Sequence, residues 1–305
     1  MKLGTKDLLT GDEISNKEFL ELIDDSIELK EDYYNSGTSP TELTNTTLAM
    51  LFEKPSTRTR VSFETGMKQL GGHTIILSLN EMQHSRGESI EDTAKTLSGY
   101  VDAIMARVYE HDFIEKLAKY ATVPVINGLS NSFHPCQTLA DMMTIKEHKK
   151  NFKDIKIAWI GDGNNVCNSL IFGCSKTQTQ ISIATPKGFE PDPEVVKKSS
   201  KHTSVDLTTD PESAIKDADI VMTDTFTSIH TSDPKRIKKF LPTFQVNDSL
   251  MGKAKNDAIF MHCLPAKREQ EVTSSVIDGQ QSVVWDQAEN RLHSQKALLL
   301  SLLGI

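Results

Sequence analysis

Short apolar runs alternate with longer amphipathic stretches along most of the chain, and this alternation limits the possible folds more than any other feature. The runs that predict strands fall into two groups, at residues 48–52, 74–79, 103–108 and 123–126, and then at residues 155–160, 181–184, 220–223, 258–261 and 282–285. Strands and helices that alternate in this way form right-handed crossovers and parallel sheets. The sequence therefore predicts an α/β fold with two open parallel-sheet domains of similar size, joined by interdomain helices.

The boundary between the two predicted domains is expected where the chain becomes polar and basic, at residues 148–153. We therefore expect a first domain at residues 1–148 and a second at residues 149–286. Capping residues at 286–289 precede a last segment whose apolar side chains recur at helical spacing. This segment, residues 287–305, is predicted to be a helix that packs back on the first domain.

Composition and charge exclude several classes of protein. The chain is 37% hydrophobic and 25% charged, which fits a globular protein and not a disordered or membrane-embedded one. The net charge of −8 argues against nucleic acid or an anionic membrane as a partner. The longest apolar stretch, at residues 297–305, is much shorter than the ~20 residues of a membrane span, and the N-terminus lacks a signal-peptide pattern. We expect a cytoplasmic protein.

A candidate anion site follows the first predicted strand. This strand ends at Phe52, and the next residues are Glu53-Lys54-Pro55-Ser56-Thr57-Arg58-Thr59-Arg60, followed by a helical pattern. The free amides and the dipole of a helix N-terminus attract anions, hydroxyls add donors, and a guanidinium grips phosphate with two hydrogen bonds. An isolated Ser-Thr-Arg is more often an ordinary helix cap. Three hydroxyls and two arginines within residues 56–60 favour a phosphate site.

The two arginines of this segment are expected to have different roles. Arg58 and Arg60 are two residues apart, so they cannot face the same way on a helix, whereas Arg60 and Glu64 form an i,i+4 pair. We therefore assign Arg58 to the ligand and Arg60 to a structural ion pair.

Residues 52–60 resemble the carbamoyl phosphate motif of the aspartate and ornithine carbamoyltransferase family. His-Pro-Cys-Gln-Thr-Leu-Ala-Asp at residues 134–141 is similar to the second signature of the family, and His-Cys-Leu-Pro at residues 262–265 resembles the version found in its ornithine branch. The resemblance extends over nearly the whole chain through Gln83 before the Arg-Gly-Glu-Ser segment, Asp-Gly-Asn-Asn at 162–165, and Asp-Gln-Ala-Glu-Asn-Arg at 286–291.

The resemblance implies transfer of a carbamoyl group from carbamoyl phosphate to the side-chain amine of L-ornithine, without a cofactor. Family members are usually homotrimers or assemblies of trimers with shared active sites. The first domain would bind carbamoyl phosphate and the second the amino acid. The residues assigned to the phosphate are Ser56, Thr57, Arg58, Thr59 and Gln83, the last from a neighbouring subunit. Those assigned to the carbonyl oxygen are Thr59, Arg107 and His134, and those around the carbamoyl amide are Gln137, Cys263, Leu264 and Arg291.

The positions of three of these residues can be weighed on physical grounds. Arg107 lies at the end of a predicted strand, where ligands bind in open α/β sheets, although a solvated surface charge is the alternative. His134 precedes Pro135 and so lies at the first turn of a helix, where its ring can donate to an oxyanion; the alternative is a buried, satisfied histidine. Gln137 lies three residues on, on the same helical face.

The four cysteines, which are few and irregularly spaced, are expected to be reduced thiols. Cys263 comes at a strand end before Pro265, which makes it a plausible partner for a substrate amine, against the alternative of a small core residue. Adjacent strand residues point to opposite faces, so His262 and Cys263 are not expected to chelate one metal ion unless the strand has ended. We predict no metal site.

Gly161-Asp162-Gly163-Asn164-Asn165-Val166 follows a predicted strand and invites comparison with a dinucleotide-binding motif. Val166 stands where the third glycine of such a motif would be. The next strand ends at Thr185 without the acidic residue that binds a ribose. We therefore predict no dinucleotide cofactor, and the resemblance instead assigns Asn165 to the α-amino and carboxylate groups of the amino acid.

The acceptor loop departs from the family pattern Asp-x-x-x-Ser-Met-Gly. Asp224 and Ser228 match it, but Ile229 replaces methionine and His230 replaces glycine. The resemblance assigns Asp224, Ser228 and Ile229 to ornithine. Ile229 has a branched side chain and His230 lacks the flexibility of glycine, so another acceptor, such as putrescine or a modified ornithine, is an alternative. A non-catalytic relative that binds the same ligands is the other alternative.

The predicted chemistry requires an unprotonated amine. An alkylammonium group has a pKa near 10.4, so the acceptor must lose a proton before it attacks, and Asp224 and Cys263 are the candidates for binding and deprotonating it. Arg58, Arg107 and His134 would stabilise the negative charge that develops on the carbonyl.

Overall fold

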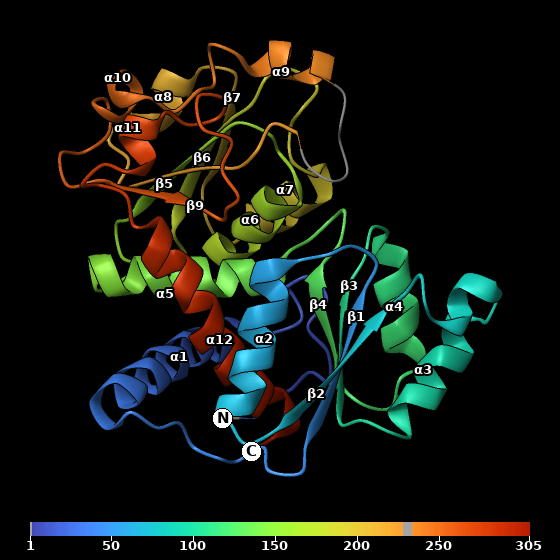
Figure 1. The fold of residues 1–305 in the computed structure, drawn as a ribbon. Helices are drawn as coiled ribbons and strands as arrows, with labels where there is room; N and C mark the ends of the chain where they lie inside the picture. The colour runs from blue at the N-terminus through green and yellow to red at the C-terminus, as the bar shows by residue number, and fades with distance from the viewer. Residues whose placement is uncertain (1, 228–233) are drawn as a thin grey trace. The chain divides into compact units, whose positions relative to one another are not determined.

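The computed structural model describes residues 2–227 and 234–305 (Figure 1). The chain divides into two compact units, each with its own sheet. The first contains Met1–Met143 together with Glu289–Ile305, and the second contains Thr144–Ala288.

The first unit is built on a four-stranded parallel sheet. Its strands are β1 (Thr47–Phe52), β2 (His73–Ser78), β3 (Ala103–Arg107) and β4 (Val125–Leu129), in the order β2-β1-β3-β4. The inner strands β1 and β3 are almost fully buried and apolar, as expected for a sheet covered on both faces. Strand β2 forms an edge and is partly exposed. The carboxyl ends of β1 and β3 are therefore adjacent.

Helices cover both faces of this sheet. They are α1 (Asn16–Ser36), α2 (Thr57–Gln69), α3 (Ile90–Ser98), α4 (His111–Tyr120), and the larger parts of α5 (Pro135–Lys149) and α12 (Val284–Leu303), with the short 3₁₀-helix η1 (Gln83–Arg86). Helices α3 and α4 pack on one face, and α1, α2 and α12 lie on the other (Figure 1). The core under α3 and α4 contains Ile104, Ile114 and Leu117.

Local sequence signals explain how α1 begins and ends. Ser15 and Glu18 form a capping box, in which each side chain bonds the backbone of the other residue. The helix ends at Gly37, whose φ of 72° is a left-handed conformation that glycine adopts without strain. Between them, Phe19 and Leu22 are buried on one face.

The second unit contains a five-stranded parallel sheet. Its strands are β5 (Lys156–Ile160), β6 (Gln180–Ala184), β7 (Val205–Thr208), β8 (Ile220–Thr223) and β9 (Ile259–His262), in the order β7-β6-β5-β8-β9. The chain continues from β5 to β6 on one side and later reaches β8 on the other. The carboxyl end of β5 is thus a topological switch point, where open α/β sheets bind ligands.

The helices of the second unit are α6 (Asn165–Thr177), α7 (Pro193–Ser199), α8 (Pro211–Ile215), α9 (Pro234–Phe240), α10 (Asp248–Met251), α11 (Ser274–Ile277) and the first residues of α12. Every residue of α6 is buried. The core of this unit includes stacked Phe226 and Phe240 rings, with centroids 4.5 Å apart.

The predicted fold class is confirmed, but two predicted elements need correction. The strand expected at residues 282–285 is wrong, because this segment makes one isolated bridge, between Phe260 and Ser282, and α12 already begins at Val284. The sequence also failed to predict β7. This edge strand is polar and partly exposed, with Leu207 47% exposed, so it lacks the apolar pattern of a buried strand.

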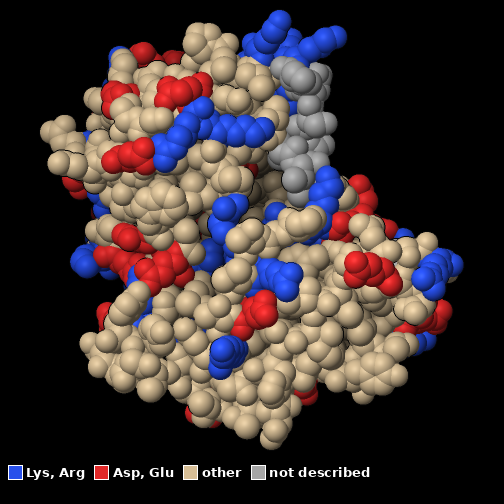
Figure 2. All heavy atoms as spheres, in the orientation of Figure 1, with Lys and Arg blue, Asp and Glu red and all other residues tan. Residues whose placement is uncertain are grey.

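The compact units change at residues 143–144 and 288–289, inside α5 and α12, and the boundary at residues 148–153 stays a prediction. Helix α5 continues to Lys149, so the basic residues there belong to its last turn. Among the described residues, no helix is long and apolar enough to cross a membrane. Acidic and basic side chains are interspersed over the face that Figure 2 shows.

Candidate functional site

The N-terminus of α2 presents unbonded amides next to hydroxyl side chains. Strand β1 ends at Phe52, and the chain turns through residues 53–56 into α2, with Ser56 as the extended N-cap residue. The Ser56 hydroxyl makes no capping hydrogen bond to the helix among the described contacts. The amides of the first turn are therefore directed at whatever lies beyond the helix end, which is the arrangement that binds anions.

The two arginines of α2 differ in their surroundings. Arg60 is exposed, and its Nε lies 3.5 Å from Oε2 of Glu64. Arg58 is half-buried, and its charge acts on His134. The two side chains therefore point to different environments, although their roles remain predictions.

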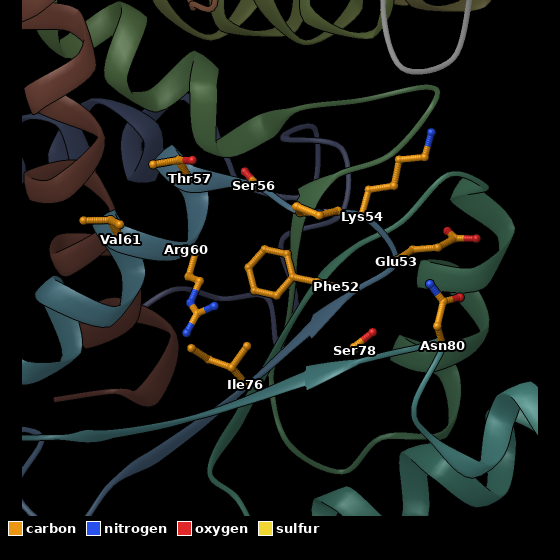
Figure 3. Close-up of a pocket in the computed structure, with 11 residues that line it drawn as sticks. Phe52, Glu53, Lys54, Ser56, Thr57, Arg60, Val61, Ile76, Ser78 and Asn80 are labelled. Carbon is orange, nitrogen blue, oxygen red and sulfur yellow. The ribbon is translucent and has the colours of Figure 1, made fainter.

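A cavity of about 570 Å³ opens beside this helix end. It is lined by residues from β1, β2 and the start of α2, and Figure 3 shows Ser56 and Thr57 on one side, Ile76 on the opposite side and Phe52 between them. Arg107 and His134 are not among its lining residues. A phosphate needs hydrogen-bond donors, and in the first unit such donors lie around Thr59.

Buried donors converge on Thr59 inside the first unit. Arg107, the last residue of β3, donates to the Thr59 hydroxyl at 3.2 Å, and Arg291 of α12 lies 3.5 Å from the same oxygen. Arg291 also donates to Oε1 of Gln137 at 2.7 Å. Because β1 and β3 are neighbours, their carboxyl ends bring α2 and Arg107 together.

His134 lies in the same cluster and is 4% exposed. Burial lowers the pKa of its imidazole well below the ordinary value, and the positive charges of Arg291, Arg107 and Arg58 lower it further. The ring is therefore neutral at physiological pH. A neutral imidazole can donate one hydrogen bond to an oxyanion without itself needing a counter-ion.

The first turn of α5 directs two neighbouring side chains differently. Gln137 donates to Oδ1 of Asp141 at 2.8 Å and accepts from Arg291, so it belongs to the donor cluster. Cys136 instead donates to the carbonyl of Asn127, and burial raises the pKa of its thiol to about 12. Cys136 is thus a core residue, and its neighbour faces the cluster.

Gln83 is not brought into this cluster by its own unit. It begins η1 and its side chain is exposed, with no hydrogen bond to residues 56–59 in the described part of the chain. Cys263 and Leu264, which the resemblance also assigns to carbamoyl phosphate, belong to the second unit.

The second unit gathers an amide and a carboxylate at the carboxyl ends of β5 and β8. Asn164 caps α6 through its side-chain oxygen, which accepts from Val166 and Cys167, and its Nδ2 donates to Oδ2 of Asp224 at 2.7 Å. Asn165, the residue predicted from the sequence, begins α6 and is 8% exposed. The sequence analysis missed Asn164, although an Asn before a helical pattern is a cap signal.

Cys263 lies next to Asp224 because β8 and β9 are paired. Thr223 and His262 are partners in the register, so the residues that follow them leave the sheet side by side. The Cys263 thiol donates to Oδ1 of Asp224 at 3.3 Å. Cys263 is partly exposed, whereas the other three cysteines are buried.

His262 raises the question of a metal ion, because its ring, Cys263 and Asp224 offer ligand atoms within 4.8 Å of one another. The strand ends at His262, so the argument from opposite strand faces does not apply. The ring is engaged in another way: Nδ1 accepts from the Leu264 amide at 2.8 Å, and Nε2 lies 3.2 Å from Oε1 of buried Glu271. A metal ion would have to displace one of these hydrogen bonds.

Three residues assigned by the resemblance remain: Leu264 for the carbamoyl amide, and Ser228 and Ile229 for ornithine. Leu264, with a φ of 56°, is half-buried after β9. Ser228 and Ile229, like His230, lie outside the described residues.

Gly163 has a packing role that explains the glycine-rich motif. Its amide donates to the carbonyl of Phe189 at 2.8 Å, and a Cβ there would lie 2.2 Å from the backbone nitrogen of Pro191. The chain at 189–191 therefore passes directly over the turn after β5. The glycine is required by this close approach of two backbone segments.

The chain thus has two parallel α/β units. One contains a donor cluster for an anion, and the other contains a carboxylate, an amide and a thiol. These features define a class of two-domain enzymes that act on small molecules. Two family models match the chain: the aspartate/ornithine carbamoyltransferase carbamoyl-P binding domain at residues 6–147, and the Asp/Orn binding domain of the same family at residues 153–302. The chain belongs to the aspartate/ornithine carbamoyltransferase family.

Individual relatives are similar over almost the full length. The ornithine carbamoyltransferase of Cenarchaeum symbiosum is 61% identical over 99% of both chains, and that of Archaeoglobus fulgidus is 50% identical over 98% of both. The solved structure of ornithine carbamoyltransferase from Pyrococcus furiosus superposes with a TM-score of 0.93 at 50% identity, and the match covers 98% of this chain and 97% of that one.

Proposed function

We propose that this protein transfers the carbamoyl group of carbamoyl phosphate to the side-chain amine of L-ornithine, giving L-citrulline and phosphate. The amine nitrogen attacks the carbonyl carbon and forms the new C–N bond. The bond from that carbon to the phosphate oxygen breaks, phosphate leaves with the electron pair, and the nitrogen releases one proton. No covalent bond to the protein is required.

The first unit supplies the groups for carbamoyl phosphate. Ser56, Thr57, Arg58 and Thr59 bind the phosphate, with amides of α2 behind them. Arg107 and neutral His134, with the Thr59 hydroxyl, donate to the carbonyl oxygen as it gains charge. One such donor is worth about 3 kcal/mol. Gln137 and Arg291 orient the carbamoyl amide, together with Cys263 and Leu264 from the second unit.

The second unit supplies the groups for the acceptor. Asn165 binds the α-amino and carboxylate groups, with Ser228 and Ile229 also assigned to ornithine. Asp224 and Cys263 bind the side-chain amine and accept its proton. Their mutual hydrogen bond supports this role, because a carboxylate and a thiol held together can bind an ammonium group and then take its proton.

One observation carries the proposal: Arg107 and Arg291 both lie within 3.5 Å of the Thr59 hydroxyl in the first turn of α2, next to the buried His134. Arg291 is buried and Arg58 and Arg107 are partly buried, and holding such cations together is costly unless an anion is bound among them. A dianionic phosphate ester with a carbonyl group satisfies both the cations and the neutral donor.

The test is a citrulline assay with fixed carbamoyl phosphate and either ornithine or putrescine as acceptor. We expect ornithine to be strongly preferred. Faster carbamoylation of putrescine would show that ornithine is not the preferred acceptor. It would leave the proposed carbamoyl phosphate site unchanged. Tight carbamoyl phosphate binding by calorimetry, without turnover of any amine, would instead indicate a non-catalytic relative.

We also infer a homotrimer, or an assembly of trimers, in which Gln83 of a neighbouring subunit contacts the phosphate. The exposed position of Gln83 supports this arrangement. Light scattering should then give at least about three times the 33.9 kDa mass of one chain, and Gln83→Ala should raise the KM for carbamoyl phosphate. The mass of a single chain would contradict it.

A further inference from the structure

Two cations hold successive backbone carbonyls just after Asp224. Arg236 of α9 donates through Nε to the carbonyl of Phe226 at 2.8 Å. Lys267 donates through Nζ to the carbonyl of Thr227 at 3.0 Å and to its hydroxyl. Phe226 and Thr227 are buried, so their carbonyls need such partners inside the protein.

The Arg236 side chain is itself fixed on several sides. Its guanidinium forms an ion pair with Asp162, and these side chains are only 17% and 11% exposed. The guanidinium also lies 4.5 Å from the ring centre of Phe189 and 5.4 Å from that of Phe240. A planar guanidinium can bond a carboxylate and a carbonyl at the same time, which a single ammonium does less well.

These contacts connect the three segments that carry the acceptor groups. Asp162 follows β5, and Arg236 links it to the backbone after β8. Lys267 lies four residues beyond Cys263 and links the segment after β9 to the same backbone. At the centre, Asp224 accepts from both Asn164 and Cys263. The position of the Asp224 carboxylate therefore depends on the two carbonyls that follow it.

We propose that Arg236 and Lys267 are positioning residues for the acceptor half of the site. They hold the backbone at Phe226 and Thr227, and this backbone orients Asp224 toward Cys263 and the incoming amine. Arg236 has the larger role, because it is more buried and bridges two partners, whereas Lys267 is exposed to solvent. The kinetic part of this inference rests on the proposed function, but the effect on Cys263 does not.

The kinetic test uses Arg236→Met and Lys267→Met. Hydrogen bonds from charged donors are strong enough that losing one should raise the KM for ornithine about tenfold in Arg236→Met, and less in Lys267→Met. The KM for carbamoyl phosphate should stay within about twofold. Lys267→Arg, which keeps a charged donor, should restore the ornithine KM. Arg236→Lys should restore it only partly.

The matched control is Lys253→Met. Lys253 lies in the same unit and pairs with Glu212 at 3.0 Å, but both side chains are largely exposed. It should leave both KM values unchanged. If Arg236→Met and Lys267→Met raised both KM values equally, or lowered only the melting temperature, the two residues would be general stabilisers and the inference would be overturned.

A second readout does not depend on turnover. The Asp224 carboxylate next to the Cys263 sulfur disfavours the reactive thiolate. Displacing it in Arg236→Met or Lys267→Met should therefore speed alkylation of Cys263 by iodoacetamide several-fold, measured by peptide mass spectrometry. Asp224→Asn removes the carboxylate charge, so its alkylation rate gives the upper limit for the other two variants. The other three cysteines, which are buried, should stay unmodified and report that the fold is intact.

The two readouts separate the two claims. Wild-type protein that makes no citrulline, combined with faster Cys263 alkylation in the variants, would reject the proposed function and keep the positioning role. Normal citrulline synthesis by the wild type, with an unchanged alkylation rate and no selective rise in ornithine KM in the variants, would reject the positioning role alone.

Discussion

The two halves of the candidate site are held by different parts of the fold. In the first unit, the donors occupy the ends of regular elements: Arg58 is in the first turn of α2, Arg107 ends β3, and His134 directly precedes α5. In the second unit, Asp224 and Cys263 lie on irregular segments after β8 and β9. Hydrogen bonds between those segments hold them in place.

The halves also differ in charge. The first surrounds a neutral histidine with guanidinium groups, and the second combines a carboxylate with a thiol and amides. A cationic half is suited to a phosphate and an anionic half to an amine. The first half is therefore fixed by secondary structure, whereas the second depends on contacts between loops.

Replacing Arg58 should have the largest effect. Arg58→Gly is expected to lower kcat/KM for carbamoyl phosphate by more than about 10³-fold, because it removes a charged, two-pronged donor to the phosphate. Citrulline formation at limiting carbamoyl phosphate measures this loss. Near-normal synthesis would show that the phosphate binds elsewhere.

Arg60→Gly is the matched control for this variant, since it places the same residue two positions further along α2. Its exposed ion pair with Glu64 contributes little. We expect kcat/KM within about threefold of the wild type, after allowing for the ~1 kcal/mol cost of glycine in a helix. Equal losses in both variants would mean that the helix, and not Arg58, was damaged.

Replacing Asp224 should affect the other half alone. Asp224→Asn keeps a hydrogen-bond acceptor but loses the charge and the basicity, so kcat should fall about 10²- to 10³-fold. Calorimetry should show unchanged affinity for carbamoyl phosphate. Asp210→Asn is the control, because Asp210 caps α8 in the same unit and asparagine caps equally well.

The same difference explains which parts of the two halves could be predicted from the sequence. Residues 56–60 carry their signal locally, since hydroxyls and arginines at a strand-to-helix junction define an anion site without knowledge of the fold. The proximity of Asp224 and Cys263 required only that both follow strands of one parallel sheet. These features could be predicted from the sequence because the residues lie at the ends of strands and helices.

The contacts that organise the acceptor half could not be predicted from the sequence in this way. Asp162 and Arg236 are 74 residues apart, and Thr227 and Lys267 are 40 apart. Neither pair has a spacing that marks it in the sequence. Strand β7 was missed for a related reason: an exposed edge strand does not need the apolar pattern by which buried strands are recognised.

Replacing His134 should have an intermediate effect on rate. His134→Gln keeps a donor but changes its position, so kcat should fall about 10²-fold. Burial and the charges of Arg291, Arg107 and Arg58 hold the pKa of this imidazole well below 6.5. The acid limb of the pH profile of kcat/KM should therefore be the same in the wild type and the variant. Loss of that limb in the variant would show that His134 titrates during catalysis.

The smallest effect concerns stability and pH. Because the pKa of His134 is lowered by folding, its proton binds more tightly to the unfolded chain, and stability is lost as the pH falls below about 6.5, the unfolded value. This loss should grow as the pH is lowered from about 6.5 toward 5. Urea unfolding at several pH values should show it, and His134→Gln should reduce it.

The second unit should respond in the opposite direction. Burial raises the pKa of Asp162 to about 6, against the lowering effect of Arg236, so folding favours its protonated form. Its contribution to stability is therefore greatest below its unfolded pKa and is lost as the pH rises through about 6. Asp162→Asn should remove this dependence, and hydrogen exchange of each unit would distinguish the two trends. If both units lost protection together as the pH fell, the electrostatic contrast between the halves would not govern their stability.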